Sequence, residues 1–216
     1  MSVFPTVQAV NAEGAWRRAI RFTMRQECRP GPRTGEFRAA DNLIDHGLAR
    51  DKLACANHPA DKGKATAYGV TQGTYDDYRV SHGLPTQHVF NAAAAEILDI
   101  FKVRYWAYLP AHCTERLAVA VFDTAVLHGK VYAAKRLQTA LGLKADGVVG
   151  PATLSAVQQT GAEARALQPF LQARDDRYEQ IVGFDGSQVV FFKGWEKRHD
   201  MLCDELGVPR TKDTAA

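Results

Sequence analysis

Trp16 to Glu27 read WRRAIRFTMRQE, and this stretch decides the fold. Apolar side chains recur in it at steps of three and four residues, which is the period of an α-helix with one buried face. The positions on that face are Trp16, Ala19, Ile20, Thr23, Met24 and, at the end of the pattern, Glu27. We therefore expect a helix over residues 15–27 that carries a carboxyl group on its apolar side.

Glu27 is the first candidate for chemistry. Burial makes a carboxylate costly to ionise, so a glutamate on a buried helix face can hold a proton near neutral pH, as a general acid must. Downstream, Asp61 and Thr66 flank the loop Lys62-Gly63-Lys64. Cleavage of a glycosidic bond needs an acid and a second group that activates water or stabilises the positive ring. Asp61 could hold that water and the hydroxyl of Thr66 could orient it. The other acidic candidates are Glu36, Asp41 and Asp45.

Composition indicates an ordinary globular protein. The 216 residues are 46% hydrophobic and 24% charged, and no apolar run approaches the ~20 residues of a membrane span. Residues 1–14 lack a basic region followed by an apolar stretch, so we expect no signal peptide. The net charge of +3 suits an anionic polymer such as a bacterial cell wall, but it is too small to indicate nucleic acid. Arg17, Arg18, Arg21 and Arg25 lie at helical spacing and are expected to form a solvated face.

The rest of the chain also shows mainly helical patterns. Beyond residues 15–27, we expect helices at 36–46, 74–82, 92–105 with Asn91 as the N-cap, 115–128, 131–141, from Pro151, 163–182 and 188–206. Tyr68 to Thr71 could be extended. The predicted fold class is all-α or α-dominated α+β, a single domain with a small β-hairpin near the site as an option. Residues 211–216 are expected to be a disordered tail.

Four cysteines are present: Cys28, Cys55, Cys113 and Cys203. None forms a C-x-x-C pair, and free thiols are the default in a cytoplasmic protein. Cys28 and Cys55 enclose a segment with His46, and His58 follows at ligand-like spacing from Cys55. A zinc site or a Cys28–Cys55 disulfide there both stay open. We expect neither a cofactor nor a catalytic metal.

Several motifs, taken in order, resemble glycoside hydrolase family 108, the N-acetylmuramidases of phage endolysins and secretion-activator proteins. The first is the helix that ends at Glu27, although the family's Glu-Gly-Gly reads Glu27-Cys28-Arg29 here. The others are Asp61 to Thr71, Arg104-Tyr105-Trp106, Phe122 to Gly129, Ala134 to Gly142, Asp146 to Leu154, and Phe192 to Arg198. The resemblance covers nearly the whole chain. It differs by an insertion of about thirty residues, at about 28–57.

This resemblance implies a lysozyme-like fold and hydrolysis of the β-1,4 bond between N-acetylmuramic acid and N-acetylglucosamine. Residues 1–109 would be the catalytic part. Residues 110–210 would include the peptidoglycan-binding segment, packed with the first part as one globule. We assign catalysis to Glu27, Asp61 and Thr66, and substrate contacts to Lys64, Tyr68, Gly69 and Tyr105.

The expected partner is the glycan strand of bacterial peptidoglycan, with no nucleic acid, no membrane insertion and a monomeric state. An endolysin of this kind would stay in the host cytoplasm until the membrane is permeabilised, and then reach the periplasm and the wall. Two other functions stay open. A lytic transglycosylase would cleave the same bond with the acid alone, and a non-catalytic wall-binding phage protein would tolerate loss of Glu27.

Overall fold

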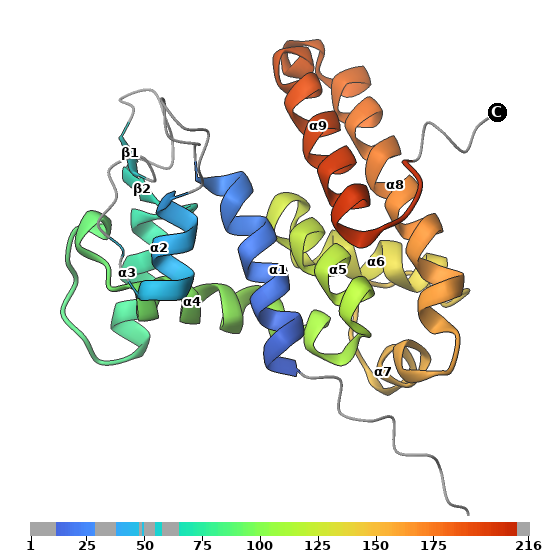
Figure 1. The fold of residues 1–216 in the computed structure, drawn as a ribbon, viewed down its shortest axis with the longest axis horizontal. Helices are drawn as coiled ribbons and strands as arrows, with labels where there is room; N and C mark the ends of the chain where they lie inside the picture. The colour runs from blue at the N-terminus through green and yellow to red at the C-terminus, as the bar shows by residue number, and fades with distance from the viewer. Residues whose placement is uncertain (1–11, 29–37, 48, 50–54, 58–64, 211–216) are drawn as a thin grey trace, which may run out of the picture. The chain divides into compact units, whose positions relative to one another are not determined.

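The computed structural model describes residues 12–28, 38–47, 49, 55–57 and 65–210 (Figure 1). The chain divides into two compact units, of which one is residues 20–104 and the other combines residues 1–19 with residues 105–216. One boundary lies inside the first helix, between Ala19 and Ile20, and the other lies between Arg104 and Tyr105. The predicted boundary between residues 109 and 110, and packing as one globule, stay predictions.

The first helix, α1, spans Ala12–Glu27 and so begins one turn before the predicted start. Its predicted apolar face is buried, since Trp16, Ala19, Ile20, Thr23 and Met24 are each at most 7% exposed. The helix ends at Glu27 as expected. The amide of Cys28 still donates to the carbonyl of Met24 at 2.8 Å, which closes the last turn.

A small helix and a small sheet follow α1. Helix α2 spans Arg38–His46, within two residues of the prediction. Strands β1 (Cys55–Asn57), β2 (Ala65–Ala67) and β3 (Val70–Thr71) form an antiparallel sheet in the order β1-β2-β3. The register pairs Cys55 with Ala67, and Ala67 in turn with Val70. This sheet contains the small hairpin that the sequence left as an option.

Helices α3 (Gln72–Ser81) and α4 (Ala94–Phe101) complete the unit of residues 20–104. The expected N-cap at Asn91 is wrong, because Asn91 lies in a 3-10 turn over Val89–Asn91 and Ala93 precedes α4. The side chain of Glu96 caps α4 instead, accepting the amide of Ala93 at 2.9 Å. The expected helix 92–105 also changes character after Phe101, where Lys102–Trp106 form a π-helical turn.

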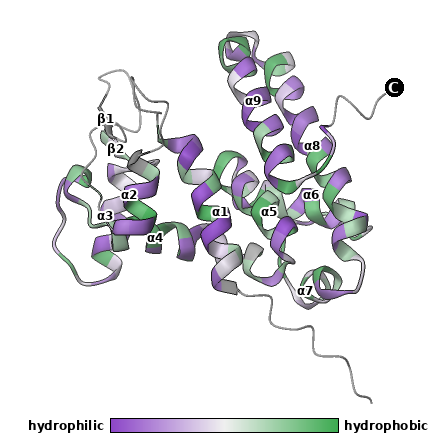
Figure 2. Cartoon of the chain, in the orientation of Figure 1, coloured by the Kyte–Doolittle hydropathy of each residue, from purple (hydrophilic) through white to green (hydrophobic). Residues whose placement is uncertain are grey.

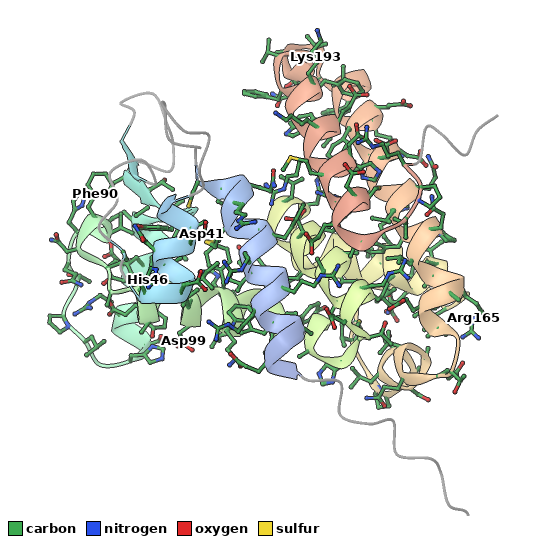
Figure 3. All side chains as sticks on the ribbon, in the orientation of Figure 1. Asp41, His46, Phe90, Asp99, Arg165 and Lys193 are labelled. Atoms are coloured by element: carbon green, nitrogen blue, oxygen red, sulfur yellow. The ribbon has the colours of Figure 1, made fainter. Side chains whose placement is uncertain are left out.

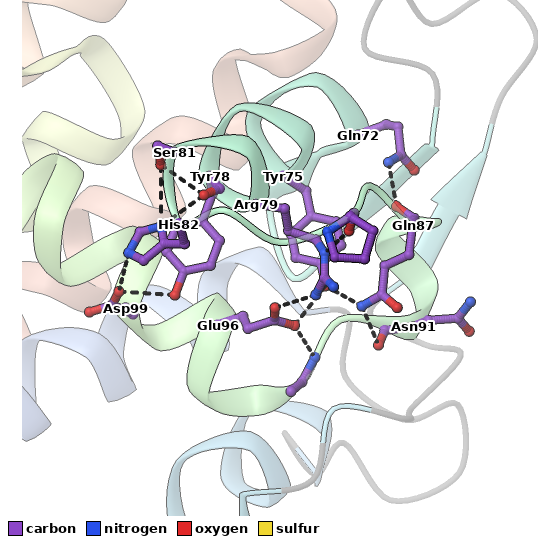
Figure 4. Close-up of polar contacts among 12 residues, drawn as sticks. Gln72, Tyr75, Tyr78, Arg79, Ser81, His82, Gln87, Asn91, Glu96 and Asp99 are labelled. Carbon is purple, nitrogen blue, oxygen red and sulfur yellow. Dashed lines mark hydrogen bonds and ion pairs between the residues drawn. The ribbon is translucent and has the colours of Figure 1, made fainter.

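A polar network ties the connection between α3 and α4 to both helices (Figure 4). Arg79 of α3 pairs with Glu96 of α4 at 2.5 Å. The hydroxyl of Tyr75 donates to the same carboxylate at 2.6 Å and accepts from the Gln87 side chain, also at 2.6 Å. Burial raises the pKa of Tyr75, and its bond to Glu96 adds to the rise. Because helix, loop and helix share this network, residues 82–93 are held on α3 and α4.

Among its described residues, the other unit contains the first half of α1 and five further α-helices: α5 (Glu115–His128), α6 (Lys130–Ala140), α7 (Pro151–Gln158), α8 (Ala162–Phe184) and α9 (Val189–Leu206). Helix α5 packs against α6, α8 and α9, and α8 lies beside α9 (Figure 1). Helix α5 lies at the predicted residues, and its apolar side chains Leu117, Val121, Phe122 and Ala125 are all buried. Pro151 is at the start of α7, as expected.

The core of this unit includes one aromatic and one ionic cluster. Trp106 makes edge-on contacts with Trp16 and Phe122, at centroid distances of 5.5 and 5.9 Å. Asp123 of α5 is fully buried and accepts from Arg174 and Arg198, each at 2.7 Å. A carboxylate inside an apolar helix requires such partners.

The turn between α6 and α7 is held by one buried glutamine. The side-chain amide of Gln138 donates to Asp146 at 2.9 Å and to Thr153 at 3.0 Å, and its oxygen accepts the amide of Gly147 at 2.8 Å. Gly147 has φ +79°, and an added Cβ would lie 2.9 Å from Val131. These contacts give the Asp146–Pro151 motif a structural role.

The described helices mix polar and apolar residues, as Figure 2 shows. None of them is long and apolar enough to cross a membrane.

Candidate active site

The site is organised by a two-residue turn between β2 and β3. Tyr68 has φ +52° and Gly69 has φ +76°, and the residues on either side of them, Ala67 and Val70, are paired. Positive φ at both central residues is the mark of a type I′ hairpin turn, which matches the twist of short strands. Among the described residues, Tyr68 is the only one other than glycine with positive φ. Such backbone strain tends to occur at functional sites.

The turn meets the end of α1. A Cβ built on Gly69 would lie 3.2 Å from Oε2 and 3.3 Å from Cγ of Glu27. The backbone of Gly69 therefore lies directly against the carboxyl group, with no side chain between them. Glu27 is half-buried and Gly69 is exposed, so solvent reaches this contact.

Thr66 lies on β2, three residues before Gly69. It pairs with Ala56 on β1 and Thr71 on β3, and it is half-exposed between the buried residues Ala65 and Ala67. Alternation along a strand places Thr66 on the face opposite to these two alanines. The same hairpin thus carries Thr66 and the glycine that contacts Glu27.

The remaining predicted site residues are distributed differently. Asp61 and Lys64 lie outside the described residues, as does the alternative acid Glu36. Tyr68 is 1% exposed, so its ring packs in the core and does not present a free face for a sugar. Tyr105 is half-buried in the π-helical turn and belongs to the unit of residues 105–216. The burial of the Tyr68 ring thus argues against its predicted sugar contact, whereas the roles of the other residues named here stay predictions.

The other acidic candidates are engaged elsewhere. Asp41 accepts from Arg21 and Arg25, and Asp45 accepts from Arg21. Arg21 and Arg25 stay 32% and 41% exposed, in keeping with the expected solvated face, but their ion pairs with α2, a segment distant in sequence, were not predicted. Arg18, likewise, pairs with Glu115 at 2.9 Å and Glu205 at 2.7 Å.

Metal binding was left open for the segment between Cys28 and His58. His58 and the side chain of Cys55 lie outside what the structure describes. In the described part of the chain, no group of three or more histidine, cysteine, aspartate or glutamate side chains could hold a metal ion.

The positive φ of Tyr68 and the approach of Gly69 to Glu27 were not predicted. No pattern in the chain indicates that the turn at Tyr68 and Gly69 meets residue 27. Its only signal was the dipeptide itself, since glycine adopts positive φ readily.

A helical fold with a short hairpin beside a carboxyl group defines the class: the chain has the predicted α-dominated, lysozyme-like fold. Comparison with solved structures supports this class. The structure of Brucella abortus SagA is similar, with a TM-score of 0.58 and 26% sequence identity, over 83% of this chain and 97% of that chain. No curated protein matched the chain.

Family comparisons then identify the two parts. Residues 53–129 match Glycosyl hydrolase 108, and residues 132–200 match the Predicted Peptidoglycan domain. Residues 53–129 are therefore a glycoside hydrolase 108 domain and residues 132–200 are a C-terminal peptidoglycan domain, which confirms the resemblance found in the sequence. These domains indicate a glycoside hydrolase that acts on peptidoglycan. The family match begins after Glu27 and includes Thr66, Tyr68 and Gly69.

Proposed function

We propose that the chain is an N-acetylmuramidase that hydrolyses the β-1,4 bond between N-acetylmuramic acid and N-acetylglucosamine, with Glu27 as the general acid. The observation that carries the proposal is the position of Glu27, at the end of α1 and against the strained Tyr68–Gly69 turn. Because Gly69 has no side chain, a bulky glycan can approach the half-buried carboxyl group of Glu27 from the side of the turn.

In this mechanism the carboxyl proton of Glu27 passes to the glycosidic oxygen as the bond to the muramic acid ring breaks. Water then adds to the ring carbon, gives up a proton to a carboxylate of the site, and leaves a reducing end. Thr66, which lies on the same hairpin as Gly69, would orient this water with its hydroxyl group. Asp61 is assigned to the same step.

The test is digestion of purified Gram-negative peptidoglycan, with the released muropeptides identified by mass. Glu27→Gln should lower turnover by about 10²–10⁴-fold, the range expected for an acid–base group. Glu13→Gln is the matched control, because Glu13 is an exposed glutamate in the first turn of the same helix. Wild-type activity in Glu27→Gln would refute the assignment and move attention to Glu36.

The products separate the alternatives. Reducing muramic acid ends support the hydrolase, whereas 1,6-anhydro ends would show a lytic transglycosylase. Binding without any release, by both wild type and variant, would indicate a non-catalytic wall-binding protein.

We extend the proposal to an endolysin role in a phage-infected bacterium. A peptidoglycan hydrolase in the cytoplasm reaches its substrate only after the inner membrane is permeabilised. Expression in a Gram-negative host should therefore cause lysis when chloroform is added and little lysis before. Lysis without permeabilisation would contradict this role and leave the enzymatic assignment intact.

A further inference from the structure

Helix α2 contacts the last two turns of α1 through four charged side chains, Arg21, Arg25, Asp41 and Asp45, which we call the α1–α2 ion cluster. Asp41 accepts from Arg21 at 3.2 Å and from Arg25 at 3.0 and 3.3 Å. Asp45 accepts from both terminal nitrogens of Arg21, at 2.9 and 2.5 Å. Figure 3 labels Asp41 on α2, and all four residues belong to the unit of residues 20–104.

The cluster has the geometry of a network. Arg21 and Arg25 are one helical turn apart on α1, and Asp41 and Asp45 are one turn apart on α2, so each pair lies on one helix face. The four side chains are 32–41% exposed. An isolated pair at such exposure would contribute little. Here the Asp41 carboxylate is shared by the guanidinium groups of Arg21 and Arg25. The Asp45 carboxylate accepts from both terminal nitrogens of Arg21, and such paired hydrogen bonds fix the orientation of the side chains in addition to pairing their charges.

This network acts on the turn that ends in Glu27. The last turn of a helix lacks onward hydrogen bonds and tends to fray. Arg25 lies in that turn, two residues before Glu27, and Asp41 anchors it to α2. The Glu27 carboxyl group lies so close to Gly69 that an added Cβ at residue 69 would be 3.2 Å from Oε2. Fraying of the turn would therefore move the carboxyl group off the hairpin.

We propose that Asp41 is a positioning residue that holds the last turn of α1 and so keeps the Glu27 carboxyl group against Gly69. The proposal rests on the proposed role of Glu27 as the acid. Asp41 lies in the insertion of residues 28–57 and before the family match, which begins at residue 53. Helix α2 of the insertion thus stabilises the last turn of α1, which carries Glu27.

The first readout is independent of catalysis. Hydrogen exchange of the amides of residues 24–28 should accelerate several-fold in Asp41→Asn and in Arg25→Gln, because either change removes the anchor. The double variant should exchange no faster than Asp41→Asn alone, since Asp41→Asn already removes the ion pair that Arg25→Gln removes. Asp41→Glu, which keeps the charge, should restore most of the protection. Asp77→Asn is the control, because Asp77 is an exposed carboxylate on α3 of the same unit.

The second readout is turnover on purified peptidoglycan. Asp41→Asn should lower kcat by about three- to tenfold with KM little changed, because a misplaced acid affects the chemical step more than binding. Unchanged exchange in both single variants, or faster exchange with unchanged kcat, would overturn the proposal. Full activity in Glu27→Gln would instead refute the assigned acid, while the exchange data would still report on the α1–α2 ion cluster.

Discussion

Gly69 presents a bare α-carbon to the carboxyl group of Glu27, with an added Cβ falling 3.2 Å from Oε2. The relationship joins two residues that are 42 positions apart in the sequence (69 − 27). It also explains why residue 69 is glycine for two separate reasons, one of space and one of backbone conformation, since its φ is +76°.

Gly69→Ala should lower kcat about 100-fold, because a methyl group at this point displaces the Glu27 carboxyl group and small misplacements of a catalytic group are costly. The measurement is turnover on purified peptidoglycan. Gly83→Ala is a matched control, since Gly83 has a similar φ of +67° but nothing within 4 Å of its added Cβ. Equal losses in the two variants would show that backbone strain alone is responsible.

Asp123→Asn should lower the free energy of unfolding of the unit of residues 1–19 and 105–216 by about 3–5 kcal/mol. The reason is that the buried side chains of Arg174 and Arg198 lose the negative charge that compensates them. The melting temperature should fall by about 6–20 °C in a chain of this size. Asp204→Asn is the comparison, since Asp204 forms an exposed pair with Arg210. It should change stability by about 1 kcal/mol or less, and a similar small change in Asp123→Asn would contradict the buried triad.

His128 should make stability fall in acid. Burial, aided by the charges of Arg174 and Arg177, lowers its pKa from 6.5 to about 3. Below pH 6.5 the unfolded chain therefore binds a proton at His128 that the folded protein does not bind. The contribution of neutral His128 to the free energy of unfolding is fully present above that pH and is lost as the pH falls toward 3.

Replacing this imidazole with His128→Phe should flatten the fall in melting temperature between pH 7 and pH 4, relative to wild type. His112→Phe, at an exposed position in the same unit, should leave the slope as it is. Parallel pH profiles for wild type and His128→Phe would show that His128 does not titrate as inferred.

Gln138→Leu should cost about 2–4 kcal/mol, because it leaves the buried amide of Gly147 without its acceptor and removes the donor to the hydroxyl of Thr153. Denaturant unfolding measures the effect. Thr139→Ala, at the next and exposed position of α6, should be nearly neutral. Equal stability of the two variants would mean that the Asp146–Gly147 turn does not depend on Gln138.

Much of the helical architecture was predictable because its signals are local. The 3.6-residue period of Trp16 to Glu27 identified the buried face of α1, and α5 lies at the predicted residues. The start of α4 was mispredicted at Asn91. An asparagine is a good cap in isolation, but Glu96 satisfies the helix start from within and leaves Asn91 in a separate turn.

The sequence by itself determined the helical fold class, the resemblance to glycoside hydrolase family 108 and the acidic end of α1, because periodicity and motif order are local features of the chain. Only the tertiary structure decided what Glu27 touches, that Tyr68 is buried with positive φ, and that Asp41 and Asp45 bind the arginines of α1. These are contacts between residues far apart in sequence. They depend on how the elements pack in space, which no local pattern of side chains specifies.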